Sequence, residues 1–152
     1  MVLDFTDKKL LNLLQHDSKQ TTKQLSLQLN LSVTAVYERI KKLEKGKVIQ
    51  KYVAIIDKHK IEKSFLVFCH IKLMQHSKDY VTTFEREVLK LEEVSECFHV
   101  SGEYHYILKV YVKDMDEYRE FMVKKLTAIK YIGSTHSTFA IEEVKNTTEI
   151  QV

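Results

Sequence analysis

The chain has 152 residues, of which 44% are hydrophobic and 30% are charged. This balance is typical of a folded globular protein and excludes disordered and collagen-like chains. The longest apolar runs hold five residues, far fewer than the roughly 18 that cross a bilayer, and the N-terminus lacks the features of a secretion signal. We therefore expect a cytoplasmic protein with no membrane partner. Cys69 and Cys97 lie in strand-like segments, where buried free thiols rather than a disulfide framework are expected.

Charge is distributed unevenly along the chain. The formal net charge is +3, but residues 1–60 carry 12 basic and 6 acidic side chains, whereas residues 61–152 carry 12 basic and 15 acidic ones. A basic segment followed by an acidic one indicates that the first part contacts a polyanion. The sequence has no proline and only three glycines, so no flexible linker is expected between the two parts.

The basic part of the sequence predicts three short helices. Thr6 is a candidate cap for the first, whose leucines recur at helical spacing as far as His16. Thr21 opens a capping box for the second helix, and Asn30 suits its left-handed end. Ser32 is a candidate cap for the third helix. The residues of the third helix that are expected to face a core are Val33, Val36, Ile40 and Leu43.

The short turn between the second and third predicted helices is typical of a helix-turn-helix, whose last helix enters the major groove of DNA. Arg39 can read a guanine through two hydrogen bonds, and the amides near Ser32 favour a phosphate. Glu38 can either accept from a cytosine amino group or pair with Lys42. A solvated helix face explains any one of these side chains, but not the whole pattern. The expected DNA-binding residues are Thr21, Thr22, Ser32, Thr34, Ala35, Tyr37, Glu38, Arg39 and Lys42.

The segment that follows is apolar and β-branched between Val48 and Ile56, and it predicts a strand that forms a wing or a connector. Lys47 and Lys51 flank it, where they could contact phosphates or protect an edge strand. The expected organisation is a winged helix-turn-helix DNA-binding domain at 1–50, a β-strand and short helical connector at 51–64, and a second domain at 65–152.

The second domain changes repeatedly between strand and helix periodicity. Helices are expected to begin near Ser77 and Asp114, and Gly102 with Glu103 is expected to join the middle strands as a hairpin. The order β-α-β-β-α-β is that of a ferredoxin-like fold, an antiparallel four-stranded sheet with two helices on one face. The whole chain is therefore of the α+β class. The expected strands are 65–73, 94–101, 104–112 and 132–143.

Two helices can cover only one face of such a sheet. Leu66, Phe68 and Ile107 are expected on the other face, which would leave apolar surface in water. A second copy of the chain is the simplest cover, so a homodimer is expected.

Several stretches occur in one order and spacing across both predicted domains. They are Leu31-Ser32 with Val36, Arg39-Ile40-Lys41-Lys42-Leu43-Glu44, Val48-Ile49, Ser101-Gly102 and Leu108-Lys109-Val110. Through them the chain resembles, over essentially its whole length, the Lrp/AsnC (feast/famine) family of prokaryotic transcription regulators.

This resemblance implies a sequence-specific DNA-binding transcription regulator that is not an enzyme and needs no cofactor. Its partners would be double-stranded DNA and a small effector, typically an amino acid, which modulates DNA binding or assembly. The resemblance also implies dimers that assemble into an octamer or a similar ring. The implied effector-binding residues are Gly102, Glu103, Tyr104, His105, Tyr106, Ser134, Thr135 and His136.

The chain departs from the family pattern at two positions that bear on function. The glycine that usually precedes Val48 is displaced to Gly46, with Lys47 in its place, so the turn is expected to differ. His105 stands where the family usually has an aspartate, which removes a carboxylate that could hold the ammonium group of an effector.

A second interpretation is a sensor or metal-binding protein that uses the second domain without catalysis. His99, His105 and His136 with Cys97 carry metal-ligating atoms, but the C-x-H spacing is not a zinc pattern, so no metal site is expected. No nucleophile motif, phosphate-binding loop or dinucleotide-binding loop appears. An enzyme is therefore not expected.

Overall fold

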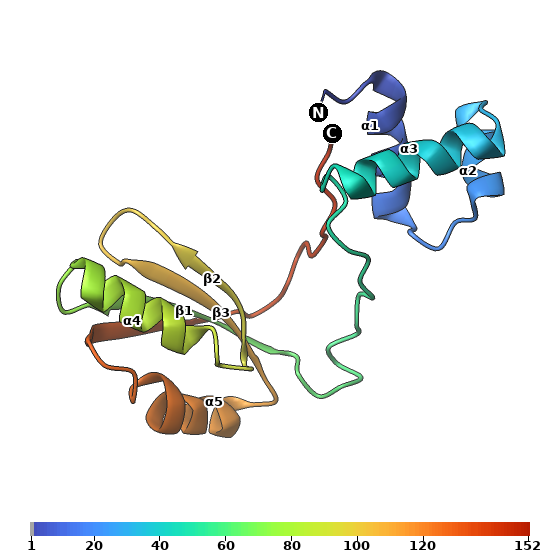
Figure 1. Ribbon diagram of the computed structural model, residues 1–152. Coiled ribbons are helices and arrows are strands. Elements are labelled where there is room, and N and C mark those ends of the chain that lie inside the picture. Colours follow the sequence, from blue (N-terminus) through green and yellow to red (C-terminus); the bar gives the residue numbers. More distant parts are fainter. Residues whose placement is uncertain (1) are drawn as a thin grey trace. The chain divides into compact units, whose positions relative to one another are not determined.

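The computed structural model describes residues 2–152, and the chain forms two compact units (Figure 1). The first unit contains the residues up to Ile55 together with Val144–Val152, and the second is Ile56–Glu143. The first unit is therefore built from both ends of the chain. The sequence predicts a second domain at 65–152, and the last part of that range, Val144–Val152, lies in the first unit.

Three helices, α1 (Phe5–His16), α2 (Thr22–Leu29) and α3 (Val33–Lys45), form the first unit. Asp4 caps α1, where Thr6 had been expected: the Asp4 side chain accepts from the Asp7 amide at 2.7 Å, and the Asp7 side chain accepts from the Asp4 amide at 3.2 Å. Two carboxylates in these positions also interact favourably with the helix dipole, which explains why the helix begins before Thr6.

The predicted caps of α2 and α3 are confirmed. The Thr21 hydroxyl accepts from the Gln24 amide at 3.2 Å, Asn30 adopts the left-handed conformation with a φ of 53°, and the Ser32 hydroxyl accepts from the Ala35 amide at 3.1 Å. Val33, however, is 48% exposed and does not face the core. The buried apolar side chains of the first unit are Leu10, Leu11, Leu14, Leu25, Val36 and Leu43.

The segment after α3 was predicted as a strand, and this prediction is wrong. Residues 46–64 contain turns and irregular chain, and the described residues before Phe65 contain no β-strand. A strand needs a hydrogen-bonded neighbour, and the first unit contains only helices to pair with. The helix-turn-helix consequently has no wing.

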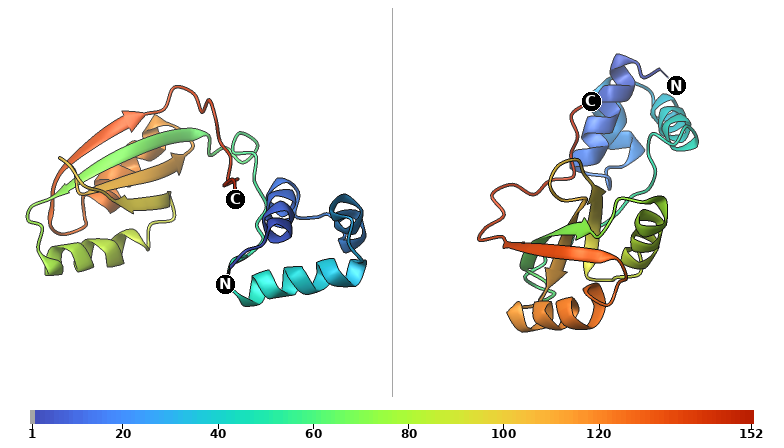
Figure 2. Two further views of the ribbon diagram at one scale, coloured as in Figure 1. Left: turned by 90° about the horizontal axis from the view of Figure 1, so that it is seen from above. Right: turned by 90° about the vertical axis from the view of Figure 1, so that its left-hand side faces the viewer.

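The second unit is a four-stranded antiparallel sheet in the order β2-β3-β1-β4 (Figure 2). Cys69 on β1 lies opposite Leu108 of β3 on one side and opposite Ser137 of β4 on the other, which defines the register of these three strands. This topology confirms the ferredoxin-like fold. The strands are β1 (Phe65–Leu73), β2 (Val94–His99), β3 (Tyr106–Val112) and β4 (Ile132–Phe139).

Helices α4 (Lys78–Val88) and α5 (Met115–Phe121), the latter continued by the π-helical turn η1 (Met122–Leu126), cover one face of the sheet. Asp114 caps α5 by accepting from the Glu117 amide at 2.9 Å, whereas the Ser77 side chain makes no such bond to α4. Alternate strand residues pack beneath these helices. The buried strand residues on this face are Val67, Cys69, Ile71, Leu73, Tyr106, Leu108, Val110 and Val112.

No helix within residues 2–152 is both long enough and apolar enough to span a membrane.

Candidate DNA-binding and effector sites

The outer face of α3 carries polar side chains that are open to solvent. Thr34, Glu38, Lys41 and Lys45 follow one another at intervals of four, three and four residues, which places them on one face of the helix, and all four are exposed. Lys41 pairs with Glu44 at 2.9 Å. The face opposite Val36 and Leu43 is therefore available to a partner along the whole length of α3.

Two larger side chains flank this polar face. Tyr37 is 49% exposed and has the Lys41 ammonium 5.7 Å from its ring centroid. Val33, which was expected in the core, is exposed near the N-terminus of α3. An exposed apolar group in this position can contact a thymine methyl group. Sequence periodicity did not identify Val33, because its three-residue spacing from Val36 is the same as that of a core residue.

The sequence predicts that Arg39 contacts a DNA base, but in the structure its partners are two carboxylates. One terminal guanidinium nitrogen, Nη1, lies 2.7 Å from Asp4 Oδ2 and 2.5 Å from Asp7 Oδ1. The hydrogen bonds that Arg39 donates to Asp4 and Asp7 raise its pKa. The Asp7 side chain is fully buried, so its carboxylate depends on this partner. Arg39 therefore joins α3 to α1 instead of pointing toward a ligand.

The other expected DNA-binding residues differ in how accessible they are. Lys42 lies 3.8 Å from Asp7 rather than beside Glu38, and Glu38 forms no ion pair among the described residues. Thr21 is exposed but uses its hydroxyl in the capping box, and Thr22 is partly buried. Ala35 is also partly buried.

The loop between β2 and β3 is longer than the predicted two-residue hairpin. It spans 100–105 and is closed by the Val100 amide, which donates to the His105 carbonyl at 2.9 Å. Gly102 has a φ of 129°, a conformation that side chains rarely adopt, and no atom lies within 4 Å of where its Cβ would be. Gly102 and Glu103 are both exposed. A ligand can therefore approach the backbone of this loop.

Two of the expected effector residues, Tyr104 and His136, come together on the face of the sheet that the helices leave uncovered. Their ring centroids are 6.1 Å apart, and the ring of His70 lies 5.3 Å from Tyr104 and 5.9 Å from His136. The sequence analysis did not identify His70. The alternation of β1 could have found it, since His70 has the same parity as Leu66 and Phe68 on the uncovered face.

His105 lies in a different cluster. Its Nδ1 accepts from the Leu73 amide at 3.1 Å, and its ring lies 5.0 Å from that of His76, which in turn is 3.2 Å from His99 between Nε2 atoms. Burial, followed by the nearby charges of His76, Lys72 and His99, lowers the pKa of His105. Burial thus disfavours the charged form of His105, and its Nδ1 is already occupied by the Leu73 amide.

Tyr106 was expected among the effector residues, but it belongs to the core. It is 1% exposed, its ring lies against those of Phe84 and His99, and its hydroxyl donates to Glu85 at 2.7 Å. Burial is the main cause that raises the pKa of the Tyr106 hydroxyl. Tyr106 shares the parity of Leu108 and Val110, so it faces the helices rather than a ligand.

The remaining effector candidates on β4 point to opposite faces of the sheet. Ser134 lies opposite Lys72 and is exposed on the uncovered face, as His136 is. Thr135 lies opposite Ile71 on the face covered by helices. The structure thus groups Ser134 and His136, and separates Thr135 from them.

The residues once considered for a metal site do not assemble into one. His136 lies on the face opposite His99, and residues 2–152 contain no group of three or more His, Cys, Asp or Glu side chains that could hold a metal ion. Cys97 is exposed as a residue, contrary to the expected buried thiol, but desolvation of its sulfur and the nearby Glu85 raise its pKa to about 11. Its thiol is therefore protonated at neutral pH.

Comparison with known proteins assigns both units. Residues 3–44 match the family model of the AsnC-type helix-turn-helix domain, and residues 66–150 match that of the Lrp/AsnC ligand binding domain. The leucine-responsive regulatory proteins of Escherichia coli and Salmonella typhimurium are each 36% identical to this chain over 150 residues, covering 99% of this chain and 92% of theirs.

Solved structures show the same fold. An AsnC family transcriptional regulator from Agrobacterium tumefaciens has a TM-score of 0.93 at 34% identity, covering 97% of this chain and 96% of its own. A transcriptional regulator from Neisseria meningitidis, solved in complex with L-methionine, has a TM-score of 0.94 at 29% identity and covers 98% of this chain and 96% of its own.

Proposed function

This chain belongs to the Lrp/AsnC family of DNA-binding transcription regulators, and from that premise we propose which of its residues bind DNA, effector and a second copy. The observation that supports the DNA-binding role is the exposed polar face of α3. Ser32 places amides and the positive end of the helix dipole where a phosphate can bind. Thr34, Glu38 and Tyr37 are the side chains best placed to reach base edges, and Lys42 and Lys45 to reach phosphates.

Arg39 has a positioning role in this proposal. Its ion pairs with Asp4 and Asp7 hold α3 against α1, so it orients the recognition helix instead of reading a base. Thr21, Thr22 and Ala35 are proposed as backbone contacts at the start of α2 and α3.

Measurement of DNA affinity over a range of salt concentrations tests this assignment. Glu38→Ala should change base preference by about 1–3 kcal/mol at one operator position, because it removes a base contact. Lys45→Ala should instead weaken binding to all sequences and reduce the salt slope by about 1, because it removes a phosphate contact. Lys124→Ala, which removes the same charge from the second unit, is the matched control. Unchanged affinity in both α3 variants would exclude α3 from the interface.

We also propose that two copies of the chain cover each other's uncovered sheet faces. Phe98 is 49% exposed there, beside the partly buried Ile107 that pairs with it in the register. Leu66 is already buried within a single chain, with only 5% of its surface exposed. Phe98 is therefore the better position for a test. Phe98→Lys should shift the mass measured by light scattering from a dimer or larger ring toward the 18.0 kDa of one chain. Leu89→Lys, at the residue that follows α4 and is 83% exposed, should leave the mass unchanged.

For the effector, we propose an amino acid that binds between Gly102–Tyr104 and the Ser134 and His136 side chains of β4. Support comes from the amino acid in the Neisseria meningitidis structure, from the open backbone at Gly102, and from the cluster of Tyr104 with His70 and His136. His105 is not proposed as a direct ligand, since Nδ1 is bonded to the Leu73 amide.

A thermal-shift screen of the twenty amino acids tests the effector. A ligand at 100 times its Kd stabilises the folded state by about 2.7 kcal/mol. Tyr104→Ala should abolish the shift, while His59→Asn, an exposed residue outside the cluster, should retain it. If no amino acid shifts the unfolding temperature of the wild type, the proposed effector class is wrong.

We propose that the regulator acts in the cytoplasm and catalyses no reaction.

A further inference from the structure

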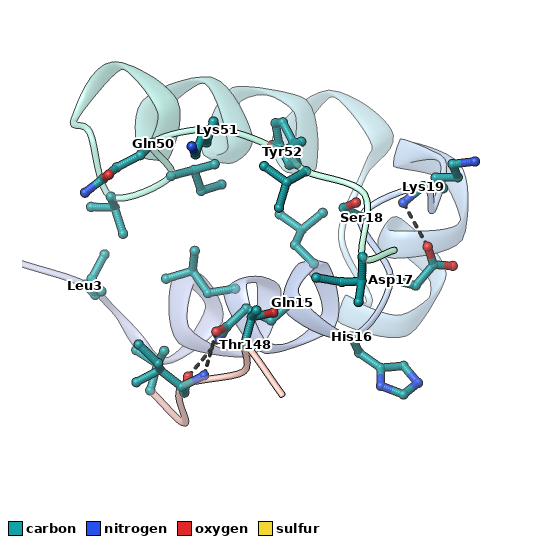
Figure 3. Close-up of a pocket in the computed structure, with 18 residues that line it drawn as sticks. Leu3, Gln15, His16, Asp17, Ser18, Lys19, Gln50, Lys51, Tyr52 and Thr148 are labelled. Carbon is teal, nitrogen blue, oxygen red and sulfur yellow. Dashed lines mark hydrogen bonds between the residues drawn. The ribbon is translucent and has the colours of Figure 1, made fainter. Parts of the chain in front are cut away.

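The C-terminal segment of the chain binds to the DNA-binding unit, although it follows the sheet in sequence. The side-chain amide of Gln15, on α1, makes two hydrogen bonds to the backbone of Ile150 (Figure 3). Gln15 Nε2 donates to the Ile150 carbonyl, and the Ile150 amide donates to Gln15 Oε1, both at 2.8 Å. The Gln15 side chain therefore pairs with Ile150 as a neighbouring strand would. We call residues Thr148–Val152 the strap.

A second contact and a cavity accompany this pair of bonds. His16 Nδ1 lies 3.5 Å from the carboxylate of Glu149, one residue before Ile150. The strap borders a cavity of about 710 Å³, whose other walls are α1 and the irregular residues 48–55. Figure 3 shows Gln15 and Thr148 on one side of this cavity and Tyr52 on the other. The strap is thus bound at one specific place on the first unit.

The connectivity of the chain gives this contact a consequence. The chain leaves the first unit after Ile55 and returns to it after Glu143, so the second unit is tied to the first through both of its ends. If the strap detaches, only the connection at Ile55 remains. Closing a loop restricts the conformations available to the segments it joins, so loss of the second tie must increase the freedom of the helix-turn-helix unit.

The strength of the strap contact favours reversible release. Ile150 is 75% exposed, so water competes for both hydrogen bonds and their net contribution to stability is small. Such a contact breaks and re-forms easily. The three helices of the first unit keep their own buried core when the strap is away, because the strap contributes no buried side chain to it.

We propose that the strap is a releasable second tether that determines how strictly the spacing of two DNA half-sites is enforced. In a dimer, two helix-turn-helix units must reach two half-sites at once, and the freedom of each unit determines which separations both can reach. With the strap bound, one spacing is strongly preferred. With the strap released, neighbouring spacings are accepted. This inference rests on the proposed DNA-binding function.

Variants of Gln15 in the full-length protein test the strap directly. Gln15→Ala removes both hydrogen bonds, Gln15→Glu keeps the acceptor and loses the donor, and Gln50→Ala is the control, since it lines the same cavity and makes no bond to the strap. Hydrogen exchange should accelerate at the Ile150 amide by roughly fivefold or more in Gln15→Ala, by less in Gln15→Glu, and not at all in the control. Equal exchange in all four proteins would overturn the strap.

The second readout is affinity as a function of half-site spacing. Duplexes selected by the wild type from a random pool are lengthened between their half-sites by one base pair at a time. In Gln15→Ala the ratio of best to worst affinity should fall at least roughly threefold, with affinity for a single half-site unchanged. An unaltered spacing profile would overturn the proposed role of the strap. Weaker binding to a single half-site with the same spacing profile would also overturn it, because that result indicates local damage to α1. If the wild type selects no duplex, the proposed function fails as well, whereas a failure confined to the spacing profile leaves that function intact.

Discussion

The helix-turn-helix unit and the sheet unit are stabilised in different ways. The core of the first contains six buried apolar residues, whereas the core of the second contains fourteen, including Phe84, Tyr106 and Phe121. The first unit compensates with a polar contact, because the fully buried carboxylate of Asp7 binds Arg39 between α1 and α3. In the sheet unit, the helices pack on the sheet mainly through apolar side chains, and the hydrogen bonds of Tyr106 with Glu85 and of Tyr118 with Ser137 add to this packing.

This difference follows from size. A short three-helix unit cannot bury enough apolar surface to make its helix packing robust, so capping hydrogen bonds and the ion pairs of Arg39 with Asp4 and Asp7 account for a larger share of its stability. The arrangement also leaves the side chains on the outer face of α3 exposed and available to bind a ligand. A charged residue on a recognition helix can therefore stabilise the fold instead of contacting the ligand. The following variants test how each unit is stabilised.

The largest effect is expected in the sheet core. Phe84→Ala should lower the free energy of unfolding of that unit by about 3–5 kcal/mol, because a fully buried ring that packs against Tyr106 is replaced by a cavity. Urea unfolding followed by circular dichroism measures the change. Leu89→Ala, at the residue that follows α4 and is 83% exposed, should change stability by less than about 0.5 kcal/mol. An equally small effect of Phe84→Ala would contradict the dominance of apolar packing.

The polar contact of the first unit should rank second. Asp7→Ala should destabilise that unit by about 2–3 kcal/mol, because it removes the buried partner of Arg39 and one half of the capping box. Arg39→Ala should be destabilising too, and the double variant should be less destabilised than the sum of the two. Additive effects in this double-mutant cycle would show that the two residues act independently. DNA binding by Arg39→Ala should weaken without any change in base preference.

A smaller gain in stability is expected just after α3. Lys47 has a φ of 59°, in the left-handed region, where a non-glycine residue is strained. Lys47→Gly should therefore raise the free energy of unfolding by about 0.5–1 kcal/mol. The same exchange at Lys45, the last residue of α3, should lower it by up to about 1 kcal/mol, because glycine disfavours helix. If Lys47→Gly were destabilising, the left-handed turn would not be a source of strain.

The smallest effect concerns acid pH. The hydrogen bond from the Asp7 amide, followed by Arg39, lowers the pKa of the Asp4 carboxyl from its ordinary value of 3.8. A carboxyl with a lowered pKa contributes its full stability above the unfolded-state pKa and loses it as pH falls through the folded-state value. Wild type should therefore exceed Asp4→Asn in stability near neutral pH, and the difference should shrink as the pH falls below 3.8, the ordinary pKa of the carboxyl. A constant difference down to pH 2 in acid unfolding would contradict this role of Asp4.

Local signals in the sequence were predictive where a hydrogen bond joins residues close in the chain. Thr21 with Gln24 and Ser32 with Ala35 are each three residues apart, and both caps were recognised. Asp4 and Asp7 have the same spacing and form the cap of α1. The sequence favours Thr6 as this cap, because a hydroxyl residue before an acidic residue resembles a helix start. The parity of Tyr106 with Leu108 favours a place in the core. The resemblance to the family implied instead that Tyr106 belongs to the effector loop.

The order of the helices and of the four sheet strands, most caps, and the alternation that separates the two faces of the sheet follow from the sequence alone, because these depend on residues within about four positions of one another. The tertiary structure fixed what Arg39 binds, since Asp4 lies 35 residues away, and fixed the return of the strap to α1, since Gln15 and Ile150 are 135 residues apart. It also decided that residues 48–56 form no strand, because a strand exists only where another backbone can pair with it.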